Sequence, residues 1–229
     1  MAFKYIWYGH GTHGIETQGH NILVDPFFTD NPAASTTADE VEADFILISH
    51  GHGDHIGDSV NIAKRTGALV ISNFEIINWL GGQGLENLHP QHIGGGFHHP
   101  FGYLKLTHAL HGSGLPDGSY GGNPAGVLLT TQAGEKIYLA CDTGLFASMK
   151  LIGEEGIDLA VLPIGDNFTM GPDDALRAVH MIQPRHVIPV HFNTWPLIEQ
   201  DAEAWAKRVE AETEAKAHVL QPGDQFSFV

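Results

Sequence analysis

The stretch Asp44-Phe45-Ile46-Leu47-Ile48-Ser49-His50-Gly51-His52-Gly53-Asp54-His55 joins an apolar run to six residues with three imidazoles and one carboxylate. A short continuous apolar run followed by a turn predicts a strand buried on both faces. The glycines let the backbone bend sharply after that strand. Turns collect Gly and Asp for conformational reasons alone, but this does not account for three histidines. The stretch therefore predicts a buried strand that delivers metal-capable side chains into one turn.

Length and composition predict one folding unit. The 229 residues fall within the range of a single large domain, so residues 1–229 are expected to form one domain. No apolar stretch approaches the roughly 20 residues that cross a bilayer, and residues 1–9 lack the layout of a signal peptide. The single cysteine, Cys141, cannot form an internal disulfide. These features predict a cytoplasmic protein without a membrane partner.

The charge balance disfavours polyanionic partners. The chain has 11 Lys and Arg against 27 Asp and Glu, which gives a formal charge of −16. Nucleic-acid binding draws most of its affinity from basic residues that neutralise phosphates, and no basic run is present. The 16 histidines outnumber Lys and Arg together, and most of them need not be ligands. A small-molecule partner is expected, and nucleic acid is not.

Short β-type runs and a few helical segments alternate along the chain. Proline followed by two carboxylates at 172–174 is typical of a helix start. Strands are predicted at 3–8, 21–24, 44–49, 68–72, 103–110, 126–131, 136–140, 159–163, 186–190, 218–220 and 225–229. Helices are predicted at 56–65, 74–80, 145–152, 172–183 and 201–215. Several strands are apolar throughout, which predicts an α/β fold with sheets covered by helices.

Further metal ligands are expected at strand ends, where α/β folds place their chemistry. His111, Asp142 and His191 each follow a predicted strand directly. With the first motif they supply five imidazoles and two carboxylates, enough for two divalent ions with one bridging carboxylate. We expect His50, His52 and His111 on one metal, Asp54, His55 and His191 on the other, and Asp142 between them.

The ordered series His50-x-His52-x-Asp54-His55, His111, Asp142, His191 resembles the metallo-β-lactamase superfamily. Within it, further segments resemble the UPF0173 group of metal-dependent hydrolases over nearly the whole chain: 9–10, 22–26, 165–171 and 189–194. The resemblance implies a four-layer αβ/βα sandwich with two metals at one edge of the paired sheets, and a hydrolase activity. His13 departs from the expected residue type and is predicted to be a solvent-facing turn residue, with a place in the lining of the site as the alternative. The two consecutive histidines at 98–99 match no motif of the group.

Two groups of members within the superfamily help to narrow the range of expected reactions and substrates. The di-iron oxygen-reducing members have a glutamate at the position of His52 and an added flavin domain, so redox chemistry is not expected. Members that act on RNA usually add a domain or a basic arm, and neither is evident in this chain. A small-molecule substrate fits better.

The chemistry expected of such a site is hydrolysis by a metal-bound hydroxide. Two divalent ions about 3.5–4 Å apart can hold a bridging water and lower its pKa toward neutrality. Asp54 would orient the hydroxide or accept its proton, and His10 would polarise the substrate, donate a proton or support a ligand. Esters, lactones, thioesters, amides and phosphodiesters remain open as substrates.

Several further residues receive supporting roles. Asp25 is predicted to fix the tautomer of a ligand histidine, and Asp166 is expected in a similar position. Asn167, Asn193 and Thr194 are candidate substrate contacts, and Trp195 is a candidate for the pocket wall. The glycine-rich loop 112–122 is expected to be either a lid over the substrate or a solvated hairpin connection.

Three questions remain open: which metal is bound, which competing function applies and whether the protein forms a homo-oligomer. Zinc suits imidazole-rich ligation best, with manganese, iron and nickel as alternatives. The competing functions are a nuclease or phosphodiesterase acting on nucleic acid, and a non-catalytic metal-binding protein. A homo-oligomer stays open, with Phe27, Phe28, Phe97 and Phe101 as either interface or core residues.

Overall fold

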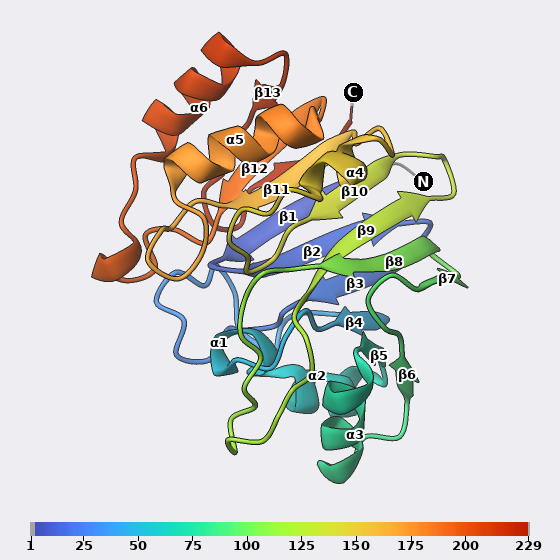
Figure 1. Ribbon diagram of the computed structural model, residues 1–229. Coiled ribbons are helices and arrows are strands. Elements are labelled where there is room, and N and C mark those ends of the chain that lie inside the picture. The colour runs from blue at the N-terminus through green and yellow to red at the C-terminus, as the bar shows by residue number, and fades with distance from the viewer. Residues whose placement is uncertain (1–2, 229) are drawn as a thin grey trace.

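The computed structural model describes residues 3–228, which contain two seven-stranded sheets packed face to face (Figure 1). The first sheet has the order β14 (Gln225–Phe226), β1 (Lys4–Gly9), β2 (Thr12–Thr17), β3 (His20–Val24), β4 (Phe45–Leu47), β5 (Leu69–Ser72), β6 (Leu88–Pro90). The second has the order β13 (Lys216–Ala217), β12 (His186–Val190), β11 (Leu159–Pro163), β10 (Lys136–Leu139), β9 (Ala125–Thr131), β8 (Gly102–His108), β7 (Gly96–His99).

Helices cover the outer faces of both sheets and complete the four-layer αβ/βα sandwich that the resemblance implies. The helices are α1 (Gly53–Ile56), α2 (Ser59–Thr66), α3 (Phe74–Gly82), α4 (Met149–Gly153), α5 (Pro172–Ile182) and α6 (Ala202–Glu212), with a 3₁₀ turn η1 (Pro196–Ile198). Figure 1 shows α1–α3 below the first sheet and α4–α6 above the second. The helix predicted at 56–65 is divided at Gly57 and Asp58 into α1 and α2.

Strand β4 explains why the first motif is preceded by unbroken apolar residues. Side chains alternate between the two faces of a strand. Phe45 and Leu47 belong to the larger buried cluster, which fills the space between the sheets, and Ile46 belongs to the cluster beneath the first sheet. Both faces of this strand are therefore removed from water.

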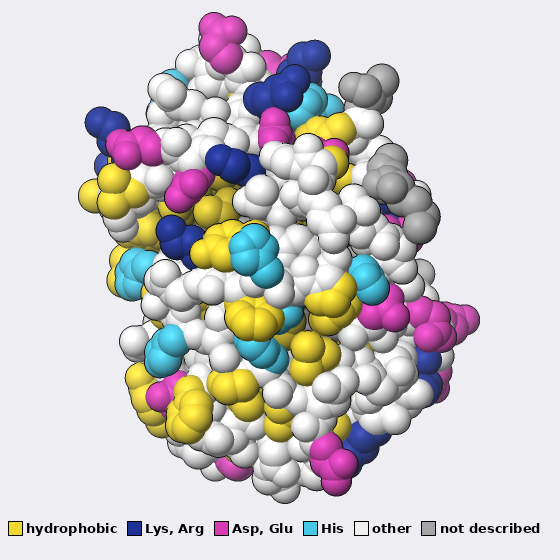
Figure 2. Space-filling view, turned by 90° about the vertical axis from the view of Figure 1, so that its right-hand side faces the viewer, with side chains coloured by type: hydrophobic (Ala, Val, Ile, Leu, Met, Phe, Trp, Pro, Cys, Tyr) yellow, Lys and Arg dark blue, Asp and Glu magenta, His cyan; other side chains and the backbone are white. Residues whose placement is uncertain are grey.

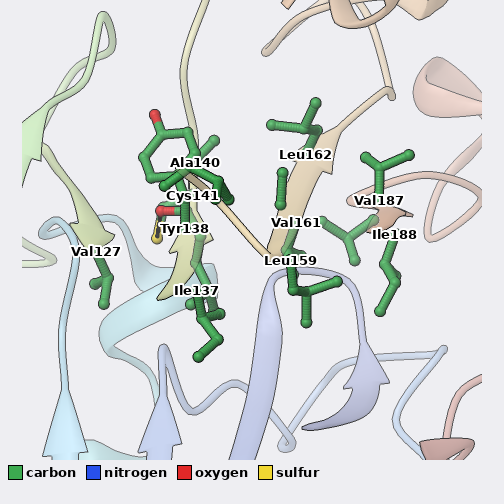
Figure 3. Packing of buried hydrophobic residues seen from close by; sticks show 14 of the residues in the cluster. Val127, Ile137, Tyr138, Ala140, Cys141, Leu159, Val161, Leu162, Val187 and Ile188 are labelled. Carbon is green, nitrogen blue, oxygen red and sulfur yellow. Dashed lines mark hydrogen bonds between the residues drawn. The ribbon is translucent and has the colours of Figure 1, made fainter. Parts of the chain in front are cut away.

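The second sheet is buried in the same way (Figure 3). Ile137, Leu159 and Ile188 point toward the strands of the first sheet, and Leu162 and Val187 point toward the helical layer. All five side chains are fully buried or nearly so. At about 25 cal/mol per Å² of apolar surface, this burial dominates the stability of the sandwich.

The strand directions bring several chain segments to one edge of the sandwich. Strands β3 to β6 are parallel to one another, as are β10 to β13, and β1 runs in the same direction as β3 because each pairs antiparallel with β2. Loops that leave these strand ends gather on the left of Figure 1. Residues that directly follow β1, β3, β4, β10 and β12 can therefore meet there.

Some strands lie in segments for which no strand was predicted. The structure adds β2, β6 and β7, and it replaces the strand predicted at 218–220 with β13. These short segments contain glycine, histidine or charged residues, and they form because a neighbouring strand offers its backbone groups. Strand β14 covers the first part of the range predicted at 225–229, whose last residue lies outside the described residues.

The expectation for His13 was wrong. Its side chain is 1% exposed in β2, and Nδ1 lies 2.9 Å from the hydroxyl of Tyr5. The β2 strand places this residue between two paired strands, and the tyrosine hydroxyl supplies the partner that a buried imidazole needs.

The apolar residues considered for an interface are mostly core residues. Phe27, Phe28 and Phe101 are buried, whereas Phe97 on β7 is 49% exposed.

Within residues 3–228, no helix has the length and apolar character needed to span a membrane.

Many histidines lie away from the strand ends. Figure 2 shows histidine and hydrophobic side chains together in the middle of the face that it presents, with charged residues mainly near its top and right edge. On strands β6 and β7, His89 lies against Phe97, and His99 stacks on Phe101. Burial lowers the pKa of His99 to about 4, helped by His89. These imidazoles act as packing residues.

Asp58 ties the loop after β3 to the end of the motif. Its Oδ2 accepts hydrogen bonds from the backbone N–H of Phe28 and of Thr29, and its Oδ1 accepts one from the Thr29 hydroxyl. Asp58→Ala should lower the free energy of unfolding by about 1–3 kcal/mol, because buried donors lose their acceptor. Chemical denaturation in the presence of a chelator measures this. Asp39→Ala, at an exposed carboxylate, is the control, and equal stability of the two variants would contradict the anchoring role.

Candidate metal centre

The predicted ligands come together at the edge where the strand ends meet. His50 and His52 follow β4, and Asp54 and His55 lie in α1, which starts directly after His52. His111 follows β8, Asp142 follows β10 and His191 follows β12. The site is therefore assembled from both sheets, and neither sheet alone provides it.

His50, His52 and His111 form one group. One ligand nitrogen from each lies within 4.8 Å of the others. The ring centroids are 4.6 Å apart for His50 and His52, and 5.0 Å for His52 and His111. The remaining nitrogen of His50, Nδ1, lies 2.9 Å from the hydroxyl of Ser49, which leaves Nε2 directed at the group. Three imidazole nitrogens at this separation can bind one divalent ion.

Asp54, His55 and His191 form a second group, and the structure adds His10 to it. One ligand atom from each of the four lies within 4.8 Å of the others. His10 is fully buried, and its Nε2 lies 3.2 Å from Asp54 Oδ2. Its ring centroid is 3.9 Å from that of His191. This group offers imidazole and carboxylate ligands together.

Asp142 lies between the two groups. Its Oδ2 is 3.5 Å from Nε2 of His111, 3.3 Å from Nε2 of His55 and 3.2 Å from Nε2 of His191. A single carboxylate oxygen therefore faces a member of the first group and two members of the second. This is the position that a bridging carboxylate needs.

Buried nitrogens without a hydrogen-bond partner test whether a metal fits. His55 Nε2 and both ring nitrogens of His191 make no hydrogen bond within residues 3–228, although each Nε2 lies within 3.3 Å of the Asp142 carboxylate. The two Nε2 atoms therefore lie beside the Asp142 carboxylate without a hydrogen bond to it. A buried polar atom left unpaired costs about 1–3 kcal/mol, and coordination to an ion would remove that cost. The donor set fits a divalent metal.

The two carboxylates are held ionised. Burial alone would raise the pKa of Asp142, but the nearby His191 and His55 outweigh it and hold that pKa well below its usual range. For Asp54, burial again opposes ionisation, and the hydrogen bond from His10 with the field of His55 lowers the pKa well below its usual range. Both groups are therefore anionic at neutral pH, as ligands must be.

Several imidazoles are held neutral. Burial, with smaller contributions from neighbouring histidines, lowers the pKa of His50 well below its usual value, and burial also lowers the pKa of His111. The pKa of His10 falls to about 4 through burial and the proximity of His191, against the effect of Asp54. His55 is the exception, because Asp142 and Asp25 outweigh burial and raise its pKa, so this imidazole holds a proton that a bound metal would have to displace. A neutral imidazole keeps the lone pair that a metal needs.

Asp25 supports two of the ligands from behind. Its Oδ2 lies 3.0 Å from His55 Nδ1 and accepts from the Ser49 hydroxyl, while its Oδ1 accepts from the Ser49 backbone N–H. Ser49 in turn contacts His50. These contacts use both carboxylate oxygens and direct Nε2 of His55 toward the centre, as the sequence suggested for Asp25.

Thr194, predicted from the sequence as a candidate substrate contact, contacts His10 in the structure. Its Oγ1 lies 2.8 Å from His10 Nδ1. If the hydroxyl donates to Nδ1, the proton of the neutral ring resides on Nε2 and is donated to Asp54. The supporting role of Thr194 was not predicted, and neither was that of Ser49, although Ser49 directly precedes the motif. The only sequence signal for either role is a hydroxyl close to a candidate ligand histidine.

The backbone takes a left-handed conformation at four strand ends around the centre. His10, Asp25, Cys141 and His191 have φ values of 53°, 48°, 53° and 55°. Each conformation costs free energy for a residue with a Cβ, and such residues concentrate at functional sites. Each one turns the chain abruptly after β1, β3, β10 or β12. These turns bring His10, Asp142 and His191 to the centre and place Asp25 behind His55.

Gly11 permits close approach to His55. A Cβ at this position would lie 2.6 Å from Cε1 of the imidazole, a distance that side chains do not tolerate. Any larger residue would push the ring away from its place between Asp25 and Asp142. Sequence alone could not identify this requirement, because it depends on contact between distant segments.

A pocket of about 410 Å³ opens over the centre and falls within the usual range for small-molecule sites. Its floor is polar and its wall apolar; it is lined by His52, Asp54, His111, Asp142, Phe168, His191, Trp195 and Leu197. Trp195 lies on the wall as expected. Its ring is 4.7 Å from that of His10.

Asn167 and Asn193 do not line this pocket, and the substrate contacts expected for them stay predictions. The Oδ1 of Asn193 accepts a hydrogen bond from the backbone N–H of Gln200, and its side chain faces a separate hollow. Asn167 is exposed, with φ of 50°, and Asn193 has φ of 57°. Asparagine tolerates this left-handed backbone better than most residues, so both shape turns.

The loop 112–122 is a small hairpin, and none of its residues lines the pocket. Gly114 and Tyr120 form an isolated bridge, and buried Leu115 packs in the cluster beneath the first sheet. Ser113 Oγ accepts from the backbone N–H of Gly51. The loop thus braces the motif from outside, which favours the hairpin over the lid.

Cys141 belongs to none of the ligand groups within residues 3–228. Its side chain is buried, its Sγ lies 3.7 Å from the carbonyl oxygen of Leu139, and burial raises the pKa of the thiol well above its usual value. A protonated, buried thiol is a poor metal ligand.

Comparison with known proteins matches this architecture. The family model described as beta-lactamase superfamily domain matches residues 20–192. A UPF0173 metal-dependent hydrolase of a Geobacillus species is 49% identical over 226 residues, covering 96% of this chain and 98% of the relative. The UPF0173 metal-dependent hydrolase of Thermus thermophilus is 47% identical over 216 residues, covering 94% and 95%.

Among solved structures, Igni18, a novel metallo hydrolase from the archaeon Ignicoccus hospitalis, superimposes with a TM-score of 0.91. It is 35% identical, and the alignment covers 100% of this chain and 99% of Igni18. The alignment therefore covers both sheets and the strand ends that form the centre. The chain belongs to the metallo-β-lactamase superfamily and, within it, to the UPF0173 group of metal-dependent hydrolases.

Proposed function

We propose that this protein is a dinuclear metal-dependent hydrolase of a small-molecule ester, lactone, amide or phosphodiester, with zinc as the metal that its ligands suit best. The two ligand groups that share Asp142 carry the proposal. His50, His52 and His111 would hold one ion; Asp54, His55 and His191 would hold the other. The imidazole majority of the ligands favours zinc, and manganese, iron or nickel can use the same atoms.

Bound divalent ions supply Lewis acidity and lower the pKa of water, so a protein nucleophile is not required. Asp54 has one carboxylate oxygen facing His10 and the second ligand group, and about a third of its side chain is exposed to the pocket. An ionised carboxylate in this position can accept a proton from the attacking water and orient it toward the substrate.

His10 is the second residue that we assign to catalysis. Its Nε2 lies beside Asp54, and its ring packs against Trp195 at the pocket wall. A neutral imidazole there can donate a hydrogen bond to Asp54 and fix the direction of its carboxylate. Because the side chain is fully buried, it acts on the reaction through this carboxylate.

The pocket supports a small molecule over nucleic acid. Within residues 3–228, no Lys or Arg lines it, and the chain has an excess of acidic residues. Phosphate backbones are bound chiefly by cations, so a polyanion would find little attraction beyond the centre itself.

Metal stoichiometry tests the dinuclear assignment. We expect about two equivalents of metal per chain in the wild type and about one in His191→Ala, because that change removes a ligand of the second group. Elemental mass spectrometry of metal-loaded protein measures both values. His180→Ala, which removes an exposed histidine on α5, should retain the wild-type value. One equivalent or less in the wild type, unchanged in His191→Ala, would remove the second metal from the proposal.

Asp54→Asn tests the proton acceptor. It keeps the shape of the side chain but removes its charge, so kcat/KM for lactone, ester or phosphodiester probes should fall about 10²–10⁴-fold. Metal content measured on the same samples separates lost binding from lost catalysis. Asp39→Asn is the matched control on an exposed loop. Wild-type turnover in Asp54→Asn at full metal occupancy would show that this carboxylate is not the acceptor.

Thr194→Val tests whether the hydroxyl positions His10. The change keeps the shape but leaves Nδ1 without its partner, so kcat should fall about 10–100-fold while metal content stays unchanged. Thr194→Ser restores the hydroxyl and should recover most of the activity. If Thr194→Val and Thr194→Ser behave alike, the hydroxyl has no part in positioning the imidazole.

A further inference from the structure

Three apolar side chains form the outer wall of the pocket above the candidate metal centre. Phe168 is 50% exposed and Leu197 is 68% exposed, and Trp195 lines the same pocket. Scattered exposed apolar residues are common, but a group that borders a polar site is typical of a ligand-binding surface.

The turn that presents Phe168 is well built. Its ends are joined by a hydrogen bond from the Asp166 N–H to the Met170 carbonyl, 3.0 Å, and Asn167 N–H donates to the side chain of Asp166. Met170 N–H donates to the carbonyl of Thr143, the residue after Asp142. Phe168 is therefore held at a fixed place relative to the shared carboxylate.

The turn that presents Trp195 and Leu197 is held in a similar way. Asn193 N–H donates to the carbonyl of Ile198, 2.8 Å, and the side chain of Asn193 accepts from Gln200. The Gln200 side chain donates to the carbonyl of Gly165, just after β11. Both apolar segments thus begin at left-handed asparagines and are tied back to strand ends of the second sheet.

The pocket offers no partner for a charged group away from the centre. Its polar residues are the candidate ligands on the floor, and among residues 3–228 neither Lys nor Arg contributes to its lining. A carboxylate or ammonium placed against the wall would lose its hydration without gaining a counter-charge, which is costly. An alkyl or aryl group there would lose only apolar contact with water.

Resting on the proposed hydrolase function, we propose that Phe168, Trp195 and Leu197 form a subsite for an uncharged, apolar portion of the substrate. The scissile bond then lies on the polar floor, and an alkyl or aryl acyl group of modest size lies against the wall. The specificity of the enzyme comes from this subsite, and its residues take no part in bond cleavage.

The test uses pairs of probes that differ only at the distal end. 4-Nitrophenyl hexanoate and the mono-4-nitrophenyl ester of adipic acid compare a methyl end with a carboxylate end. The wild type should prefer the hexanoate ester at least 10-fold in kcat/KM. Phe168→Ser and Leu197→Ser should each lower that preference by about 10-fold or more, in the range of lost contacts in hydrophobic pockets. Leu151→Ser, at an exposed leucine of α4 outside the pocket, should leave it unchanged.

A binding measurement separates this proposal from the proposed function. Calorimetric titration of metal-loaded protein with hexanoate and with adipate requires no turnover. If no ester is cleaved but hexanoate binds more tightly than adipate, and Phe168→Ser abolishes the difference, the apolar subsite stands without the esterase chemistry. If esters are cleaved without regard to the distal group, or if Phe168→Ser and Leu197→Ser match Leu151→Ser in both measurements, the subsite proposal is overturned and the hydrolase stands.

Discussion

The Asp142 carboxylate holds the functional edge of this protein together. It is 5% exposed, and one of its oxygens lies within 3.5 Å of imidazole nitrogens from three other chain segments. Burial of such a charge is unfavourable unless cationic or hydrogen-bonding partners surround it. The two sheets must therefore pack so that the ends of β4, β8, β10 and β12 converge, and the large apolar core provides the free energy that keeps them there.

Around this carboxylate, the residues that hold the histidines in place differ from those that form the apolar wall of the pocket. Asp25, Ser49 and Thr194 hold ligand or neighbouring histidines by hydrogen bonds, and left-handed turns set the directions of the chain. The apolar wall stands farther out and has no polar partner to satisfy. A centre that is fixed from behind can accept different substrates in related proteins when only the outer turns change.

Prediction of the fold succeeded where hydrophobic burial alone decides the structure. Strands β11 and β12 were predicted to the residue, because unbroken apolar runs between turn residues have few alternatives. Strands β2, β6 and β7 were missed, since their polar and glycine-rich residues become strands only beside paired neighbours. The same pairing buries His13 against Tyr5, against the expectation of a solvent-facing residue.

For the site, the sequence by itself determined the types of the candidate ligands and their order along the chain. Metal binding requires imidazoles and carboxylates, and side chains at strand ends can reach a common edge of the sheets. The grouping of the candidate ligands was also expected from the sequence, whereas only tertiary structure brought His10 beside Asp54 and Thr194 beside His10. It also placed Asn167 and Asn193 in left-handed turns, and it put Phe168 and Leu197 at the pocket. Such relations depend on distances between segments far apart in the chain, which only packing of the two sheets fixes.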